Sequence, residues 1–320
     1  MWVKAVGRKS GWSLVTLWFV LSFNFFLFRI MPGDPIALLA RSQRLSPAAL
    51  IEQRRILGLD QALPLQYVTY LRQTLSGNLG VSMISGTPVT SIIGSRIWPT
   101  VLLVGVGTTL AIILGVIGGI AGGWNRGSSL DRSSLYGSMV LYSTPEGWLG
   151  MLVLIVLAGT LGWFPAGGYS SGAASGMAHV TDVAKHLVLP VITLTLSYMG
   201  QFLIVMRSSL VDIKEEDFIG IARAKGLTDA MVRRRHAVPN AFLPSFTLIV
   251  LSFGFVLGGA IVIETVFSWP GLGLLTYQAI QNQDYPVLQA IFLLSSSTVI
   301  VANLLADLTY RFLDPRVEVV

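Results

Sequence analysis

Asp217-Phe-Ile-Gly-Ile-Ala-Arg-Ala-Lys-Gly-Leu227, followed by Arg233-Arg-Arg-His-Ala-Val-Pro239, is a cationic stretch between two segments that are each apolar enough to cross a bilayer. Glu216 and Asp217 place negative charge at its start, and Arg223 and Lys225 place positive charge near its end, which matches the dipole of a helix. We predict a short helix over about 216–227 and a second helix from about Thr228 to Arg235, which Pro239 interrupts.

The first of these helices carries a narrow apolar face, formed by Phe218, Ile221, Ala222 and, more weakly, Ala224. Gly226 ends the helix before Leu227. On the cytoplasmic side of a membrane protein, such a helix can lay its apolar face in a groove on a soluble partner. It can equally rest on anionic lipid, held by its arginine side chains. The residues alone leave both interpretations open.

The composition indicates an integral membrane protein. Of the 320 residues, 53% are hydrophobic and only 12% are charged, whereas soluble domains carry roughly 25% charged residues. The chain contains no cysteine, which excludes a disulfide framework and a cysteine-ligated metal. The net charge of +6 does not indicate nucleic-acid binding, because no basic stretch is interleaved with aromatic residues. Excess Lys and Arg instead mark cytoplasmic loops.

Six stretches are candidates for membrane spans, each of which needs about 20 mostly apolar residues. They cover roughly 11–31, 99–123, 136–162, 187–206, 242–268 and 288–312. The first follows basic residues as a signal peptide does, but its apolar run exceeds the roughly 7–15 residues of such peptides, so we predict a retained helix. The glycines of 115–123 lie inside the second span, where small residues allow close helix packing.

The distribution of Lys and Arg predicts both termini in the cytoplasm. With the N-terminus inside, the short loops that hold Arg126, Arg132 and the cationic stretch all fall on the cytoplasmic side, as the positive-inside rule requires. The segment 32–98 also contains arginines, but long loops count weakly in this rule. We predict an all-α integral membrane protein with six transmembrane helices.

Three regions follow from these spans: an N-terminus with the first span at 1–31, an extracytoplasmic subdomain at 32–98, and a five-helix core at 99–320 whose cytoplasmic loop covers 207–241. In the subdomain we predict helices at 46–57 and from Pro64 to Leu75, the second with Leu65, Val68 and Leu71 on one face. Whether the subdomain binds a partner or caps the helices stays open.

Residues with catalytic potential are scattered. No two histidines, nor a histidine and another ligand, stand at a metal-ligand spacing, and the sequence lacks a phosphate-binding loop. We therefore expect no catalytic residue, cofactor or metal in this chain. Glu146 follows Pro145 in the third span, where it could face a translocation path or pair with a neighbouring helix or a partner subunit. Arg29 and Glu264 lie near outward-facing span ends, where we expect them to snorkel.

Several motifs resemble the permeases of ATP-binding-cassette (ABC) importers, and in particular their dipeptide and oligopeptide branch. The cytoplasmic loop of that family has the form Glu-Ala-Ala, three residues, Gly, nine residues, an apolar residue, one more, Leu-Pro. Ala222 matches the second Ala and Gly226 the Gly, whereas Gly220 stands where the pattern has Glu. The other segments similar to this branch are Ala222-Arg-Ala-Lys-Gly-Leu227, Arg29-Ile-Met-Pro-Gly-Asp-Pro35, Glu264-Thr-Val-Phe267 and Pro270-Gly-Leu-Gly273.

The resemblance implies a type I importer permease in a bacterial inner membrane, with the helix around 216–227 coupled to an ATPase. Expected partners are a homologous second permease, two cytoplasmic ATP-binding subunits that hold ATP and Mg²⁺, and an extracytoplasmic substrate-binding protein. The cargo stays open among dipeptides, oligopeptides, glutathione, nickel and haem. The alternative function is an ion-gradient-driven secondary transporter with Glu146 or Asp307 as its proton site, although no internal repeat typical of such carriers is evident.

Overall fold

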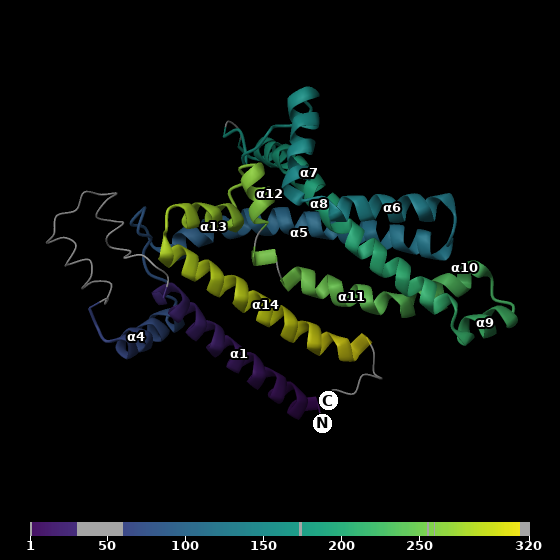
Figure 1. The fold of residues 1–320 in the computed structure, drawn as a ribbon, viewed down its shortest axis with the longest axis horizontal. Helices are drawn as coiled ribbons and strands as arrows, with labels where there is room; N and C mark the ends of the chain where they lie inside the picture. The colour runs from purple at the N-terminus through teal and green to yellow at the C-terminus, as the bar shows by residue number, and fades with distance from the viewer. Residues whose placement is uncertain (1, 31–59, 173–174, 255, 259, 314–320) are drawn as a thin grey trace.

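The computed structural model describes residues 2–30, 60–172, 175–254, 256–258 and 260–313. Within these ranges the chain is built from helices (Figure 1). Their bounds are α1 Trp2–Ile30, α4 Leu63–Leu75, α5 Val89–Trp124, α6 Ser129–Ser143, α7 Glu146–Val153, η1 Leu154–Thr160, α8 Met177–Lys214, α9 Asp217–Ala224, α10 Asp229–Val232, η2 Arg233–Ala237, α11 Val238–Gly254, η3 Val256–Gly258, α12 Ile261–Val266, α13 Leu272–Gln281 and α14 Tyr285–Leu313.

Five helical segments of the described chain are long and apolar enough to span a membrane. They are Gly7–Arg29, Val89–Trp124, Met177–Lys214, Asp229–Gly254 and Tyr285–Leu305. A sixth exists if α6 and the helix Glu146–Thr160 count as one span. The all-helical, multi-pass class predicted from the sequence is therefore confirmed.

The third predicted span, 136–162, is not one straight helix. Its two parts are bent by 104° at a break between Ser143 and Glu146. Thr144, the residue before Pro145, has an extended backbone (φ −80°, ψ 127°). The proline explains this conformation, because its ring disfavours helical geometry in the residue before it. The prediction of a continuous helix at 242–268 was also wrong: α11 ends at Gly254, and the separate helix α12 follows.

The most extensive helix pair is α5 with α8, and glycines of α5 make it close. A Cβ atom at Gly115, Gly119 or Gly123 would lie 2.5, 2.7 or 2.9 Å from a backbone oxygen of α8. The glycines repeat every four residues and so face the same neighbour. This confirms the close helix packing expected from the glycine-rich run.

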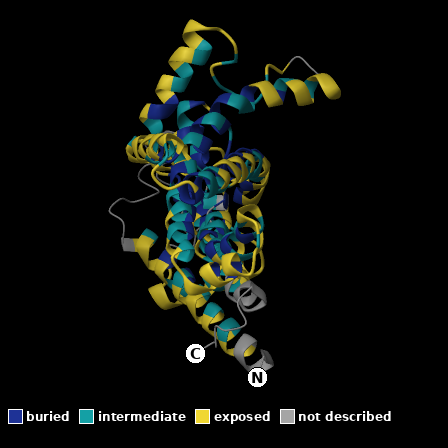
Figure 2. Cartoon of the chain, turned by 90° about the vertical axis from the view of Figure 1, so that its right-hand side faces the viewer, coloured by how far each residue is buried: buried dark blue, intermediate teal, exposed yellow. Residues whose placement is uncertain are grey.

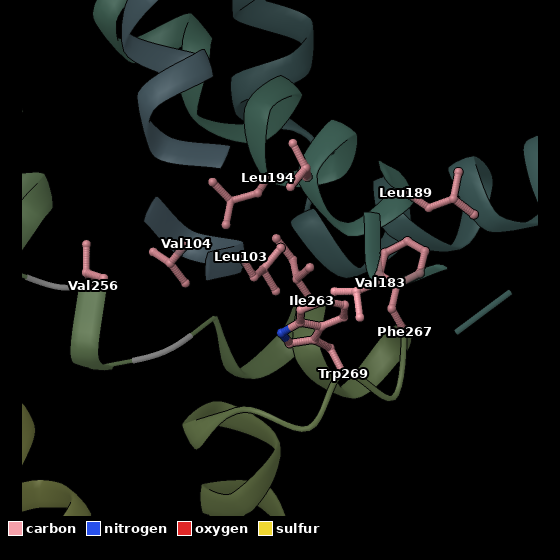
Figure 3. Close-up of a cluster of buried hydrophobic side chains, with 10 residues drawn as sticks. Leu103, Val104, Val183, Leu189, Leu194, Val256, Ile263, Phe267 and Trp269 are labelled. Carbon is pink, nitrogen blue, oxygen red and sulfur yellow. The ribbon is translucent and has the colours of Figure 1, made fainter. Parts of the chain in front are cut away.

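The largest buried cluster joins α5 and α8 to the region of α12. Leu103 of α5 and Ile263 of α12 lie beside Trp269, and Leu194 of α8 belongs to the same cluster (Figure 3). The Trp269 Nε1–H donates a hydrogen bond of 2.8 Å to the Pro99 carbonyl oxygen. Outside the buried clusters, the helices keep exposed outer faces (Figure 2), as expected of helices that contact lipid.

Glu264 lies inside the protein and does not snorkel, so the sequence-based prediction was wrong. Its side chain is fully buried. Its Oε1 accepts a hydrogen bond of 2.9 Å from the Thr100 hydroxyl, and its Oε2 accepts one of 2.9 Å from the Leu274 amide. Since α13 begins at Leu272, the carboxyl group meets the positive end of that helix. Gly271 leaves the space that the carboxyl group occupies, because a Cβ there would overlap it.

The segment 32–98, predicted to be extracytoplasmic, is described only in part. The helix predicted at 46–57 lies outside the described residues. The second predicted helix is confirmed as α4, with a proline in its first turn. Leu65 and Val68 on its predicted apolar face are exposed. Its tyrosines contact α1 instead: the Tyr67 hydroxyl lies 2.6 Å from the Ser22 hydroxyl, and the Tyr70 hydroxyl accepts a hydrogen bond of 3.5 Å from the Asn24 amide.

Candidate functional site: the loop helix between α8 and α10

The predicted helix around 216–227 is present as α9, Asp217–Ala224, at the end of the molecule where α8 ends and α10 begins (Figure 1). Glu216 precedes it in an extended conformation, and Lys225 follows it. The second predicted helix is α10, which continues through the wide turn η2 into α11. Pro239 does not interrupt it, which corrects the prediction, because η2 widens the helix just before the residue that lacks an N–H.

Gly226 ends α9 in the manner predicted. Its φ angle is +80°, a left-handed conformation that glycine adopts without steric cost. The Gly226 amide donates a hydrogen bond of 2.9 Å to the Arg223 carbonyl, and the Leu227 amide donates one of 3.4 Å to the Ala222 carbonyl. A Cβ atom at Gly226 would meet nothing within 4 Å, so backbone conformation alone selects glycine here.

The predicted apolar face of α9 divides into a buried and an exposed part. Ala222 is buried, together with Ile219. Both belong to a cluster with Trp124 of α5, Met206 and Leu210 of α8, and Val232, Ala237 and Ala241 of the following helices. Phe218 and Ile221 are 37% and 55% exposed, and Ala224 is exposed as well. The helix thus binds its own chain with one face and leaves a second apolar face free of it.

The charged residues of the predicted site are at the surface. Glu216 and Asp217 are exposed at the start of α9, and Lys225 is exposed just after its end. Leu227 is half-buried against the cluster that holds Ile219 and Ala222. The exposed apolar side chains are therefore flanked by acidic groups at one end and by a basic group at the other.

Trp124, the last residue of α5, joins α9 and α10 to the long helices. Its Nε1–H donates a hydrogen bond of 2.7 Å to Asp229 Oδ2, and its carbonyl oxygen accepts one of 2.6 Å from Lys214 Nζ. The cationic groups of Lys214, Arg223 and Arg233 lie 5.1, 6.0 and 5.9 Å from the indole ring, within the range of cation–π attraction. Arg223 also forms an ion pair of 3.3 Å with Asp229.

An ion pair holds the start of α6 to α8 close to the same end of the molecule. Arg207 donates hydrogen bonds of 2.6 Å from Nε and 2.9 Å from Nη2 to the two carboxylate oxygens of Asp131. Asp131 is buried and also accepts a hydrogen bond of 2.8 Å from the Gly127 amide. Paired and hydrogen-bonded in this way, a buried carboxylate is a rigid connection.

Glu146 lies elsewhere, at the start of α7 and just after the 104° bend. Its Oε2 accepts a hydrogen bond of 3.4 Å from the Tyr198 hydroxyl of α8, and the residue is half-buried. Figure 1 shows α9 at the right-hand end of the molecule and α7 near the middle, at the top, so the structure does not bring Glu146 to the other predicted site residues. Asp307 lies in a part of α14 whose side chains are not described. Over the described residues, no group of three or more His, Cys, Asp or Glu could hold a metal ion.

Two family descriptions match the chain. "Binding-protein-dependent transport system inner membrane component" matches residues 107–319. "Binding-prot-dependent transport system membrane comp, N-term" matches residues 3–103. The chain belongs to this transport family.

The similarity between this permease and its relatives extends over nearly the full length of the chains. It is 38% identical over 304 residues to the glutathione transport system permease protein GsiC of Pectobacterium atrosepticum, with 95% of each chain covered. It is 32% identical over 312 residues to the oligopeptide transport system permease protein AppB of Bacillus subtilis, with 97% of this chain and 98% of that one covered. The ABC importer permease identified from the motifs is thus confirmed, and the ion-gradient-driven carrier is not supported.

The fold of the permease is similar to a chain of the MetNI methionine ABC transporter in an inward-facing conformation. The TM-score is 0.55 at 17% sequence identity, with 70% of this chain and 97% of that chain covered. This likeness concerns the fold alone. Permeases of this family are multi-pass inner-membrane proteins that work together with ATPase and other subunits.

Sequence reasoning missed two residues that hold the loop helix in place, Ile219 and Trp124. Ile219 lies three positions before the predicted Ala222, which is the spacing of a buried helix face, so a signal for it was available. Trp124 was missed because its partner Asp229 is distant in sequence, and nothing in the local pattern of α5 indicates the contact.

Proposed function

We propose that this permease is the membrane-spanning subunit of an ATP-driven peptide importer, and that α9 transmits the movement of a cytoplasmic ATPase to the spanning helices. The observation that carries the proposal is the division of α9 into two faces. Ile219 and Ala222 are buried against the permease itself, whereas Phe218 and Ile221 are exposed. A helix with these two faces can bind a groove on a partner without leaving its own chain.

The contacts of α9 define a route for the movement. A force on Ile221 passes through the helix to Ile219, and from there to Met206 and Leu210 of α8 in the same cluster. Trp124 carries it to α5 through its hydrogen bond with Asp229. Since α5 and α8 pack closely along their glycines, we expect them to move together as a rigid pair, which is the behaviour of a domain that rocks about an interface.

The full transporter then needs further subunits, which we infer from the family. A homologous second permease would form the other half of the pathway, and two ATP-binding subunits would hold ATP and Mg²⁺, so that this chain performs no covalent chemistry. A substrate-binding protein would dock on the extracytoplasmic side, partly on 32–98. Both termini of the permease would be cytoplasmic, since α9 and the basic loops must then face the ATPase.

Peptides are the cargo that the relatives favour, because their names refer to glutathione and oligopeptide transport. Glu146 is our candidate for the translocation path. It lies at the 104° bend between α6 and α7. A half-buried carboxylate at this place could bind the ammonium group of a peptide. Its hydrogen bond with Tyr198 would orient it.

The test compares ATP hydrolysis with peptide uptake in proteoliposomes that contain the whole complex. The Gly226→Asp substitution introduces a charge beside the exposed face of α9 at a position where the chain leaves room for a side chain. We expect ATP hydrolysis to continue while ATP-dependent uptake falls by about tenfold or more, which corresponds to about 1.4 kcal/mol of coupling. Assembly with the second permease should not change.

Gly168→Asp is the matched control. Gly168 has a φ angle of +88°, and a Cβ atom there would also meet nothing within 4 Å, but it lies in the loop between η1 and α8. Uptake by this variant should remain coupled. Undiminished uptake by Gly226→Asp, or uptake driven by a proton gradient without ATP, would contradict the proposed function.

A further inference from the structure

A groove of about 510 Å³ lies between α1 and α14, near the N-terminal end of α1. The two helices pack along their lengths and run in opposite directions, so that the N-terminal end of α1 meets the C-terminal half of α14 (Figure 1). The groove is lined by Arg8, Lys9, Trp12, Ser13 and Thr16 of α1 and by Ile300 and Asn303 of α14. Its volume falls in the range of roughly 300–1,000 Å³ that small-molecule sites occupy.

The lining changes in character along the axis of α1. Arg8 and Lys9 supply positive charge at one end. Ser13, Thr16 and Asn303 follow with groups that form hydrogen bonds. From Arg8 to Thr16 the helix rises about 12 Å, at 1.5 Å per residue. This is the order in which a phospholipid presents its phosphate and its glycerol esters.

The surface beyond the groove continues this order with apolar side chains. Val15, Trp18 and Phe19 of α1 are 53%, 58% and 61% exposed, and they lie toward the middle of the span Gly7–Arg29. Trp12 is 67% exposed at the charged end of that span, where tryptophan is enriched at the boundary between headgroups and hydrocarbon. Acyl chains of a lipid bound in the groove would contact this apolar surface.

We propose that the groove binds the headgroup of one anionic phospholipid in the leaflet that the N-terminal end of α1 reaches. Arg8 and Lys9 contact the phosphate, the polar side chains contact the glycerol region, and the acyl chains follow α1. Basic residues at the end of any span attract anionic lipid without a preferred place. The groove adds a second helix and an amide, Asn303, and these give one lipid molecule a defined position.

The test is native mass spectrometry of the full complex, titrated with phosphatidylglycerol and separately with zwitterionic phosphatidylcholine. We expect one phosphatidylglycerol to bind more tightly than the rest and phosphatidylcholine to show no such step. The double substitution Arg8→Gln, Lys9→Gln should weaken that step by about 30-fold, which corresponds to about 2 kcal/mol for two cations at the membrane surface. Asn303→Leu keeps both charges and should weaken it severalfold.

Arg132→Gln with Arg234→Gln is the matched control, because both residues are exposed and the net charge falls by the same amount. It should leave the tight step unchanged. Equal losses in the control and the groove variants would overturn the proposal in favour of general attraction. Failure of phosphatidylglycerol to bind the intact complex, with Arg8 crosslinking to another subunit instead, would also overturn it. Neither result depends on whether α9 couples to an ATPase.

Discussion

At the scale of single residues, Trp124 has the largest influence on the loop that carries α9. It is the last residue of α5, it is buried, and it hydrogen-bonds to Asp229 while its carbonyl accepts from Lys214. Three cationic groups surround its indole ring. The side chain therefore combines apolar burial with polar contacts, which suits tryptophan better than any other residue.

Replacing Trp124 by Phe should loosen this loop without unfolding the protein. The ring stays in the cluster, but the hydrogen bond to Asp229 is lost, which costs about 1 kcal/mol. Amides of α9 and α10 should then exchange hydrogen roughly fivefold faster, as measured by hydrogen exchange with mass spectrometry. Trp148→Phe, at a tryptophan that is 57% exposed, serves as the control. Unchanged exchange in α9 would show that Trp124 does not hold the loop.

Glu264 is a second buried residue whose polar contacts join separate helices, here through hydrogen bonds with Thr100 of α5 and Leu274 of α13. The Glu264→Gln substitution keeps the size of the side chain but replaces one acceptor oxygen by an NH₂ group, which leaves either the Thr100 hydroxyl or the Leu274 amide without its acceptor. We expect a loss of about 1–3 kcal/mol in stability, seen as a lower thermal unfolding temperature in detergent. Asp212→Asn removes an exposed charge and should leave that temperature unchanged. Equal temperatures for both variants would mean that the buried hydrogen bonds contribute little.

At the scale of helices, the pair α5 and α8 is the rigid part of the permease. Its closeness depends on glycines whose missing side chains let the two backbones approach. The same pair carries Trp124 at one end, and near the middle of the two helices it contributes Leu103 and Leu194 to the cluster that contains Trp269. A disturbance of the helix contact should therefore affect the whole molecule.

Gly119→Ala tests this contact directly. A Cβ atom at this position would lie 2.7 Å from the Leu203 carbonyl oxygen and 2.7 Å from Met206 Cβ, so the helices must separate, at a cost of about 1–3 kcal/mol. Thermal unfolding in detergent should show the loss. Gly105→Ala, on the same helix but with nothing within 4 Å of the new Cβ, should be neutral. A loss of the same size in both variants would contradict the importance of the close packing.

Hydropathy and helix-end signals predicted most helices but not where they bend or which side chains they bury. The second predicted span, 99–123, lies within the longer α5, whose first ten residues include Arg96 and several Ser and Thr residues that hydropathy excludes. The bend at Pro145 had a local signal, the proline itself, which disfavours a helical conformation in Thr144. The burial of Glu264 had none, because it depends on Thr100 and Leu274, and a pattern within one segment carries no information about tertiary partners.

At the scale of the whole molecule, the motifs predicted the family correctly, and the family identifies the chain as a permease of a transport system. The permease presents α9 at one end, whereas α7, after the bend that follows α6, lies away from that end (Figure 1). Contacts with an ATPase and with cargo would thus take place on different parts of one helical body. The sequence contained both sites, but their separation in space became evident only from the fold.

The most direct test of the coupling role is site-specific crosslinking from α9. The chain has no native cysteine, so Ile221→Cys and Phe218→Cys each provide a single reactive thiol on the exposed face. In native membranes, a short thiol–amine crosslinker should join these positions to a subunit that mass spectrometry identifies as a P-loop ATPase. Ser76→Cys, after the end of α4, should give no such product. Crosslinks from Ile221→Cys to lipid or to no protein at all, in membranes where the ATPase copurifies with the permease, would contradict the account.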